Sequence, residues 1–154
     1  FGFKAGIRYK DFNLRAFIQG QAEAETYPFR SQYSSYPEYY FTQRWTKDNK
    51  DADFPRASER LDYYNFKESE FWMSDASFIR LKYIEFAYNV PSKWVDFADF
   101  RVYLRSSNPW LIYDNIPNKS FDPEIPDNYT WFAENIGSYY PQMATIIIGL
   151  DITL

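Results

Sequence analysis

The sequence contains neither cysteine nor histidine among its 154 residues. Without cysteine it can form no disulfide, no thiolate metal site and no cysteine nucleophile. Without histidine it lacks the side chain that most often serves as a general acid or base near neutral pH and as a zinc ligand. Most familiar active sites are therefore excluded, and we predict no catalytic residue, no metal site and no cofactor.

Long apolar runs and an excess of positive charge are also missing. The longest apolar run lies around residues 146–148, far below the roughly 18 consecutive apolar residues that a membrane-spanning helix needs. The formal net charge is −4, and the isoelectric point is near 4.9. A nucleic acid would require a basic stripe facing its phosphates, so nucleic acid is not expected as a partner.

Aromatic residues, by contrast, make up 23% of the chain, and many of them alternate with polar residues. This period of two is typical of β-strands. The fourth strand is expected to stop at Asn108-Pro109, because proline cannot donate a ladder hydrogen bond. In the third strand the apolar residues change from odd to even positions midway, so the parity of its apolar face reverses. This predicts a β-bulge near Lys82 or a rim above the membrane there. The predicted strands lie near residues 1–9, 12–20, 76–90, 99–108 and 143–154.

Charge is distributed unequally between the two faces of these strands. One face of each strand is free of charge over its alternating stretch. An uncharged face fits contact either with lipid or with a second protein layer. The charged side chains that fall on the opposite face are Lys4, Arg8, Arg15, Glu85, Arg101, Arg105 and Asp151.

The predicted connections alternate between short turns and the long polar segments 21–75 and 109–142. Outer-membrane barrels have this arrangement, with tight periplasmic turns and long extracellular loops. We therefore predict an all-β, antiparallel transmembrane β-barrel. The alternative is a soluble, secreted carbohydrate-binding β-sandwich, which the aromatic content and the acidic isoelectric point would also suit.

Five strands cannot close a barrel, and an isolated sheet of this kind would leave two open edges. The remaining strands are expected to come from the chain upstream of Phe1. The 154 residues are accordingly interpreted as the C-terminal segment of one larger barrel domain, with about five of its strands. A plug domain is not expected within them.

Five stretches, in this order along the chain, carry a family resemblance. They are FGFKAGIRYKDFNLRAFIQG (1–20), RWTKDNKDADFPR (44–56), DASFIRLKYIEFAYNVP (75–91), RVYLRSSN together with FDPE (101–108 and 121–124), and Tyr140-Pro141 with the final strand. In this order they resemble motifs at the C-terminal end of the SusC/RagA family of TonB-dependent outer-membrane transporters. The sequence departs from the family pattern at Pro109, Ser120 and Leu154, where leucine, glycine and an aromatic residue are more usual.

The resemblance implies a barrel of about 22 strands with an internal plug, a size at which transporters have a plugged lumen. It implies a location in the outer membrane of a Gram-negative bacterium and the import of oligosaccharides or peptides. The implied partners are the rest of the barrel and its plug, a SusD-like lipoprotein lid, the outer-membrane lipid, and TonB, which would contact a part of the protein outside these residues.

Aromatic residues of the predicted loops are candidate contacts for a substrate or for the lid, because tyrosine and tryptophan join apolar area to a polar tip. Alternatively, they pack the loops on themselves or form a girdle at the membrane interface. The candidates are Tyr39, Tyr40, Trp45, Trp72, Trp110 and Tyr113, and Tyr33, Tyr36 and Trp131 share their character.

Two sets of charged residues leave alternatives open. The basic residues on the predicted lumen-facing side suit an anionic ligand path, or else they pair with carboxylates of the plug. Asn49, Asp51 and Asp53 alternate as calcium ligands do. The EF-hand pattern nevertheless fails, because its turn glycine and its distal glutamate are missing. An Asx-rich turn is the better interpretation of this stretch.

Overall fold

The computed structural model describes residues 1–26, 38–57, 69–119, 121–124 and 140–154. These residues belong to two compact units. In chain order the elements are β1 (Gly2–Tyr9), β2 (Phe12–Gln21), β3 (Glu25–Thr26), α1 (Glu38–Thr42), the 3₁₀ helix η1 (Glu70–Trp72), β4 (Ser74–Asp75), β5 (Phe78–Asn89), β6 (Asp99–Asp114), the 3₁₀ helix η2 (Pro117–Lys119) and β7 (Thr145–Thr153).

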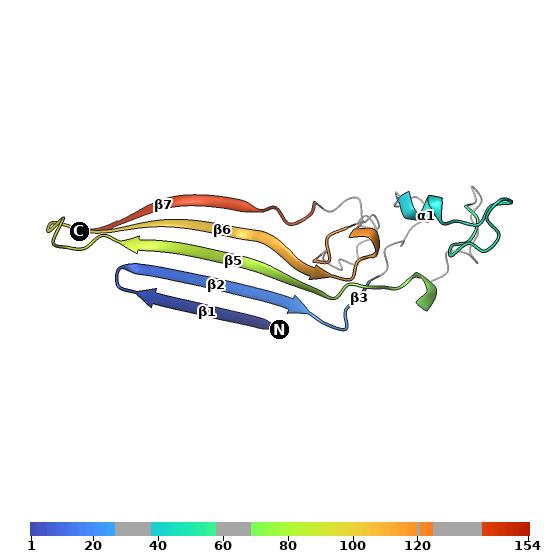
Figure 1. Cartoon of the computed structure of the whole chain (residues 1–154), viewed down its shortest axis with the longest axis horizontal. Coiled ribbons are helices and arrows are strands. Elements are labelled where there is room, and N and C mark those ends of the chain that lie inside the picture. Colours follow the sequence, from blue (N-terminus) through green and yellow to red (C-terminus); the bar gives the residue numbers. More distant parts are fainter. Residues whose placement is uncertain (27–37, 58–68, 120, 125–139) are drawn as a thin grey trace. The chain divides into compact units, whose positions relative to one another are not determined.

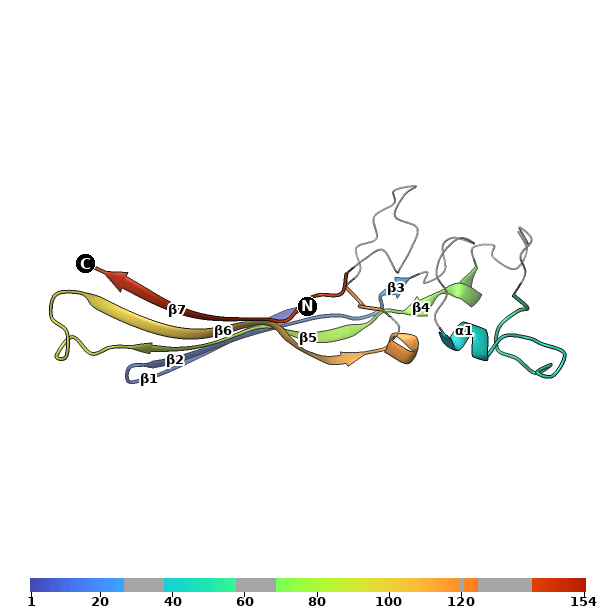
Figure 2. The same cartoon turned by 90° about the horizontal axis from the view of Figure 1, so that it is seen from above.

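The first unit is a five-stranded sheet in the order β1-β2-β5-β6-β7 (Figure 1). Every neighbouring pair is antiparallel, so the predicted antiparallel sheet of five strands is confirmed. These five strands form one layer, which Figure 2 shows from above. The strands β1 and β7 lie at its two open edges.

The register joins the uncharged faces of the strands into one surface. Ile7 pairs with Leu14, Leu14 with Phe86, Phe86 with Leu104, and Leu104 with Ile148. Because side chains alternate along a strand, the residues two positions away lie on the same face. The sheet therefore has one continuous apolar face, as the alternation predicts.

Within the part of the chain that the structure describes, no second layer covers the apolar face. Among its residues, Phe3 is 63% exposed, Leu14 40%, Phe86 47%, Val102 44% and Ile148 79%. Isolated exposed apolar residues are ordinary on a protein surface, whereas a continuous patch marks a contact with something else. A β-sandwich would bury these side chains against a second sheet, so the sandwich alternative does not fit.

The bulge expected near Lys82 is present. Tyr83 pairs with Phe17 and Leu81 pairs with Ile18, so the register between β2 and β5 passes over Lys82. A second shift occurs on β6 at the same level, where Leu81 pairs with Trp110. The two shifts account for the reversal of parity within this strand.

The prediction that the fourth strand stops at Asn108-Pro109 is wrong, because β6 continues to Asp114. Tyr83 pairs with Ser107 and Leu81 pairs with Trp110, so neither Asn108 nor Pro109 has a partner on β5. The missing N–H of Pro109 therefore removes no hydrogen bond of the β5–β6 ladder. Asn108 adopts a left-handed φ of 48°, which asparagine tolerates better than most residues.

Both long connections leave the sheet at the same end. Gln21 at the end of β2, Phe78 at the start of β5 and Asp114 at the end of β6 share one level of the register. The short turn at Lys10 and Asp11, the connection 91–98 and the C-terminus lie at the opposite end (Figure 1). This order agrees with the predicted alternation of short and long connections.

The second unit comprises residues 23–76 and 115–141. The sequence shows no period in the segment 21–75, yet its described part contains β3, α1, η1 and β4, of which β3 and β4 pair with each other. Its aromatic cluster consists of Tyr39, Tyr40 and Trp72, with Phe54 packed against them. In the described part of the chain, the helices are too short and too polar to traverse a lipid bilayer.

Candidate functional site

The charged face of the sheet brings together four residues that the sequence placed on three separate strands. Glu85 pairs in register with Arg105, and Arg101 with Asp151. The antiparallel register puts all four side chains on the face opposite the apolar surface. The face therefore carries a compact group of alternating charges.

These four side chains form a chain of ion pairs. Arg101 donates from Nη1 to Asp151 Oδ2 at 2.6 Å and from Nη2 to Glu85 Oε1 at 2.5 Å. Arg105 donates from Nε and Nη2 to Glu85 Oε2 at 2.9 and 2.6 Å. Glu85 thus accepts from both guanidinium groups, and its side chain is only 1% exposed. Charge-assisted bonds of this kind are the stronger ones in proteins.

Two tyrosine rings hold the guanidinium groups in place. The ring of Tyr103 lies between Arg101 and Arg105, with its centroid 5.1 and 5.2 Å from their Cζ atoms. The ring of Tyr83 lies 5.4 Å from the Cζ atom of Arg105. Arginine stacks favourably on aromatic faces, and this reduces its freedom to swing away.

The cations on β1 and β2 are arranged differently. Lys4, Arg8 and Arg15 are exposed on the same face, and none of them makes an ion pair with another described residue. The Nζ atom of Lys4 lies 5.6 Å from the centroid of the Phe17 ring. On the part of this face formed by β5, β6 and β7, carboxylates therefore neutralise the arginines. The part formed by β1 and β2 remains positively charged.

The aromatic candidates divide into buried and exposed residues. Tyr39, Tyr40 and Trp72 are 9%, 1% and 5% exposed, which favours the alternative that the loop packs on itself. Desolvation raises the pKa of the Tyr40 hydroxyl, an effect that the nearby Arg44 partly opposes. These three residues form the core of the second unit, and this position leaves little of their surface for a ligand.

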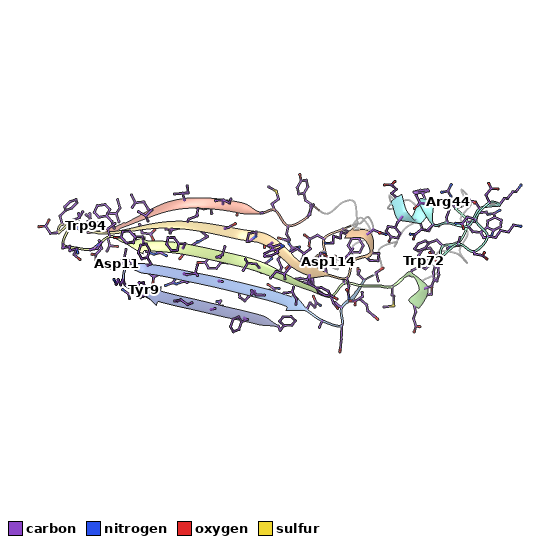
Figure 3. The ribbon with its side chains drawn as sticks, in the orientation of Figure 1. Tyr9, Asp11, Arg44, Trp72, Trp94 and Asp114 are labelled. Carbon is purple, nitrogen blue, oxygen red and sulfur yellow. The ribbon has the colours of Figure 1, made fainter. Side chains whose placement is uncertain are left out.

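A pocket of about 720 Å³ lies beside this aromatic cluster, within the range of small-molecule sites. Trp45, the remaining loop candidate, lines it and is partly exposed. Arg44 and Trp72, labelled in Figure 3, belong to the same unit. The lining includes the rings of Trp45, Phe54, Phe71 and Trp72 and the charged side chains of Asp53 and Arg56.

Trp110 and Tyr113 were expected in a loop, and this is wrong because both lie on β6. Trp110 pairs with Leu81 and Tyr113 with Ile79, in line with Ile18 and Gly20 of β2. Both rings therefore project from the apolar face near one end of the strands. This position fits the girdle alternative of the sequence analysis.

Sequence reasoning missed Phe54, Tyr83 and Tyr103 as site residues. Phe54 is held by two backbone hydrogen bonds, from its N to Gln43 O and from Trp45 N to its O. Tyr83 lies two positions from Glu85 on β5, and Tyr103 lies two positions from Arg101 and Arg105 on β6. This shared face was the only signal in the sequence that they belong to the site. Tyr33, Tyr36 and Trp131 lie outside the described residues.

The calcium hypothesis gains no support within the described ranges, where no group of three or more acidic, histidine or cysteine side chains is placed to hold a metal ion. The stretch around Asn49 forms a turn instead. Asn49 N donates to Thr46 Oγ1 at 3.0 Å, and Asn49 Nδ2 donates to Arg44 O at 3.3 Å. Thr46 and Asn49 also exchange backbone hydrogen bonds at 3.1 and 3.2 Å, so the Asx-rich stretch forms a turn as the sequence favours, closed by backbone bonds and the Thr46 hydroxyl.

Comparison with known proteins agrees with this architecture. No family model matches the chain. It is 30% identical over 99% of its length to TonB-dependent receptor P26 of Formosa agariphila, of which it covers 16%. It is 26% identical over 97% of its length to TonB-dependent receptor P3 of the same organism, again covering 16%. The chain thus spans about one sixth of these relatives.

Solved structures show the same fold. The structure of the RagAB peptide importer in the open-open state aligns with 99% of this chain, and the alignment covers 17% of the importer's matched chain. The TM-score is 0.61 and the sequence identity is 17%. The closed-closed state of that importer matches over the same shares, with a TM-score of 0.65 and 22% identity. TonB-dependent receptors are outer-membrane proteins and not enzymes. Sequence and fold together make the chain a segment of a TonB-dependent receptor, with a fold that matches part of the RagAB importer.

Proposed function

We propose that the chain forms part of the wall of a TonB-dependent nutrient importer, as the C-terminal segment of a barrel of about 22 strands. The C-terminal placement rests on the five motifs that resemble the SusC/RagA family in sequence order. The wall role rests on the sheet itself. The chain covers about one sixth of its relatives, so transport belongs to the whole receptor, to which this segment contributes.

The observation that carries the proposal is the continuous, uncharged and exposed face of the sheet. Lipid tails satisfy such a face, whereas water does not. The strand edges of β1 and β7 are open, and in a bilayer their unpaired backbone groups would have to be satisfied by further strands. A larger closed barrel meets both requirements at once.

The charged face would then line the lumen. In that position the exposed Lys4, Arg8 and Arg15 would meet carboxylates of the plug or an anionic substrate group. Arg101 and Arg105, by contrast, already form ion pairs with Glu85 and Asp151. Barrel interiors are ordinarily polar, and this supports plug pairing as the simpler role for the three exposed cations.

The second unit would lie on the extracellular side, where it would contact a SusD-like lid or the substrate. Its partly exposed Trp45 and Phe71 border the pocket described above, and such rings stack on sugar rings or cover apolar side chains of a peptide. The solved structures with the same fold are described as a peptide importer. This favours peptides over oligosaccharides as the substrate class.

The test is uptake by cells that express the full receptor, with and without functional TonB. We expect TonB-dependent disappearance of peptides from a medium that offers both peptides and oligosaccharides. Consumption of oligosaccharides alone would overturn the substrate class. Uptake that is unchanged without TonB would overturn the proposed mode of transport.

A further inference from the structure

Two segments of the second unit form the walls of the pocket beside the aromatic cluster. One wall is the segment 52–56 with Trp45, whose N–H donates to the carbonyl of Phe54 at 2.8 Å. The other wall is Ser69 with two residues of η1, of which Trp72 is 5% exposed. Backbone bonding fixes the first wall, and packing into the core fixes the second.

The rings that line the pocket meet nearly at right angles. The ring of Phe71 stands at 87° to that of Trp72, with centroids 4.8 Å apart, and at 76° to that of Phe54, with centroids 6.3 Å apart. Phe54 and Trp72 are stacked on each other at 18°. The lining therefore contains a corner, formed by the stacked pair and by the Phe71 ring, which is 57% exposed.

A corner of this kind favours a bulky apolar side chain over a sugar. A pyranose ring stacks over one level aromatic face, and the perpendicular Phe71 ring interrupts such a platform beside Phe54 and Trp72. An aromatic side chain can lie offset on one ring and edge to face with the other, and aromatic pairs prefer these two arrangements. Its burial also removes apolar area from water.

Two opposite charges accompany the rings. Asp53 and Arg56 line the pocket and are exposed, and neither forms an ion pair with another residue that the structure describes. The main chain of a peptide carries a matching group for each, because its N–H groups donate to a carboxylate and its carbonyls accept from a guanidinium. The two charges therefore suit the main chain on either side of a buried side chain.

We infer that this pocket is a side-chain site for imported peptides, in which one large aromatic side chain lies against Trp45, Phe71 and Trp72. Asp53 and Arg56 then bind the main chain on either side of it. The inference rests on the proposed function, because it takes peptides as the substrate, and it adds a preference within that class. A peptide whose side chains are all small or polar leaves the rings in water and binds less tightly.

The experiment uses the full receptor in detergent and a photoreactive pentapeptide with blocked termini. Its sequence is Gly-Ser-X-Ser-Gly, in which X is phenylalanine that carries a diazirine on its ring. Irradiation crosslinks the bound peptide, and mass spectrometry of the digested receptor locates the attachment. The peptide concentration that gives half-maximal crosslinking measures the apparent affinity. We expect attachment within residues 45–56 or 69–72.

Unlabelled competitors measure the preference for an aromatic side chain. The pentapeptide with phenylalanine at X should displace the probe at a concentration roughly tenfold or more below that needed with serine at X. Burial of one large apolar side chain is worth about that factor in affinity. An oligosaccharide of similar mass should not displace the probe at either concentration.

Matched variants separate the pocket from the rest of the unit. Phe71→Ala removes one side of the corner and should weaken crosslinking several-fold. Its control is Phe41→Ala, which removes a ring of the same unit that is 43% exposed and lies outside the lining. Arg56→Gln should weaken both competitors equally, since they share one main chain. Its control is Lys50→Gln, an exposed cation outside the lining, which should change neither.

Three outcomes are distinguishable. Attachment confined to other parts of the receptor would overturn the pocket and leave peptide import intact. Equal displacement by the phenylalanine and serine peptides, or an equal loss for Phe71→Ala and Phe41→Ala, would overturn the side-chain preference. A receptor that crosslinks no peptide specifically and takes up oligosaccharides would overturn the proposed substrate class itself, and the pocket's role with it.

Discussion

The carboxylate of Glu85 and the guanidinium of Arg105 face each other across β5 and β6, joined by two hydrogen bonds at 2.9 and 2.6 Å. The second carboxylate oxygen of Glu85 accepts from Arg101. One buried anion therefore compensates two cations on the neighbouring strand. Removal of an anion in such a position leaves charges without a partner, which costs more than the loss of an exposed pair.

Glu85→Ala should destabilise the folded receptor by about 1.5 to 3 kcal/mol, the range for hydrogen bonds to charged groups. Denaturant unfolding of the full receptor in detergent, followed by tryptophan fluorescence, measures this change. Asp151→Ala is the matched control. Its side chain is 53% exposed and, among the described residues, pairs with Arg101 alone, so its removal should cost less than about 1 kcal/mol. Equal effects of the two substitutions would contradict the central role of Glu85.

Neighbouring residues of β7 test which face meets lipid. Ile148→Glu would place a carboxylate on the apolar face and should cost about 1 to 2 kcal/mol, somewhat less than a lysine or arginine at the midplane. Ile147→Glu would place it opposite Arg105 on the charged face, where a cross-strand ion pair should offset its cost. The fraction of heat-modifiable folded receptor in unboiled gels measures both, and a greater loss for Ile147→Glu would refute the assignment of the faces.

Gly149 and Tyr103 lie against each other on the charged face. They pair across β6 and β7, and the Tyr103 ring covers the glycine so closely that an added Cβ would overlap it. Gly149→Ala should therefore push Tyr103 away from Arg101 and Arg105. We expect a cost of about 1 to 3 kcal/mol from the overlap.

A double-mutant cycle separates this overlap from a general effect of alanine at position 149. In a Tyr103→Ala background the ring is gone, and Gly149→Ala should then be nearly neutral in a denaturant unfolding experiment. Contacting residues show coupling energies of about 0.5 to 3 kcal/mol. Additive costs would show that the ring does not depend on the glycine.

Tyr40 gives the second unit a pH dependence of predictable sign. Burial raises the pKa of its hydroxyl above the ordinary value of 10.0. Folding then favours the protonated form, so this contribution to stability is complete below pH 10.0 and is lost as the pH rises through the pKa of the folded state. Subtracting the tyrosinate absorbance of Tyr40→Phe receptor from that of the wild type should give a titration with its midpoint above 10.0. A midpoint at or below that value would contradict burial of the hydroxyl.

The sheet was largely predictable from sequence because alternation with a period of two is a local signal. Residues such as Leu14, Phe86 and Ile148 occupy the face that their parity indicated. The contact of Glu85 with two arginines was not predictable, because it depends on cross-strand register, which bulges shift. The grouping of Tyr103 with Gly149 was missed for the same reason.

The aromatic cluster of the second unit was harder still. Tyr40, Phe54 and Trp72 come together from segments without any period, and only their contacts reveal that they form a core. The alternative that loop aromatics pack on themselves was stated from composition alone. Which rings would be buried could not be derived, because the chain path between them depends on individual hydrogen bonds such as Trp45 N to Phe54 O.

The continuation of β6 through Asn108 and Pro109 suggests a final test. Asn108 has a φ of 48°, and its Nδ2 donates to Met143 O at 3.4 Å. Asn108→Gly loses this hydrogen bond but accepts the left-handed backbone, whereas Asn108→Ala loses the bond and adds strain of roughly 1 to 2 kcal/mol. The greater chain entropy of glycine in the unfolded state offsets part of this difference. Denaturant unfolding should therefore rank the receptors wild type, Asn108→Gly and Asn108→Ala in order of falling stability. A more stable alanine variant would mean that the backbone at position 108 is not left-handed, and the register of β6 beyond it would then have to be redrawn.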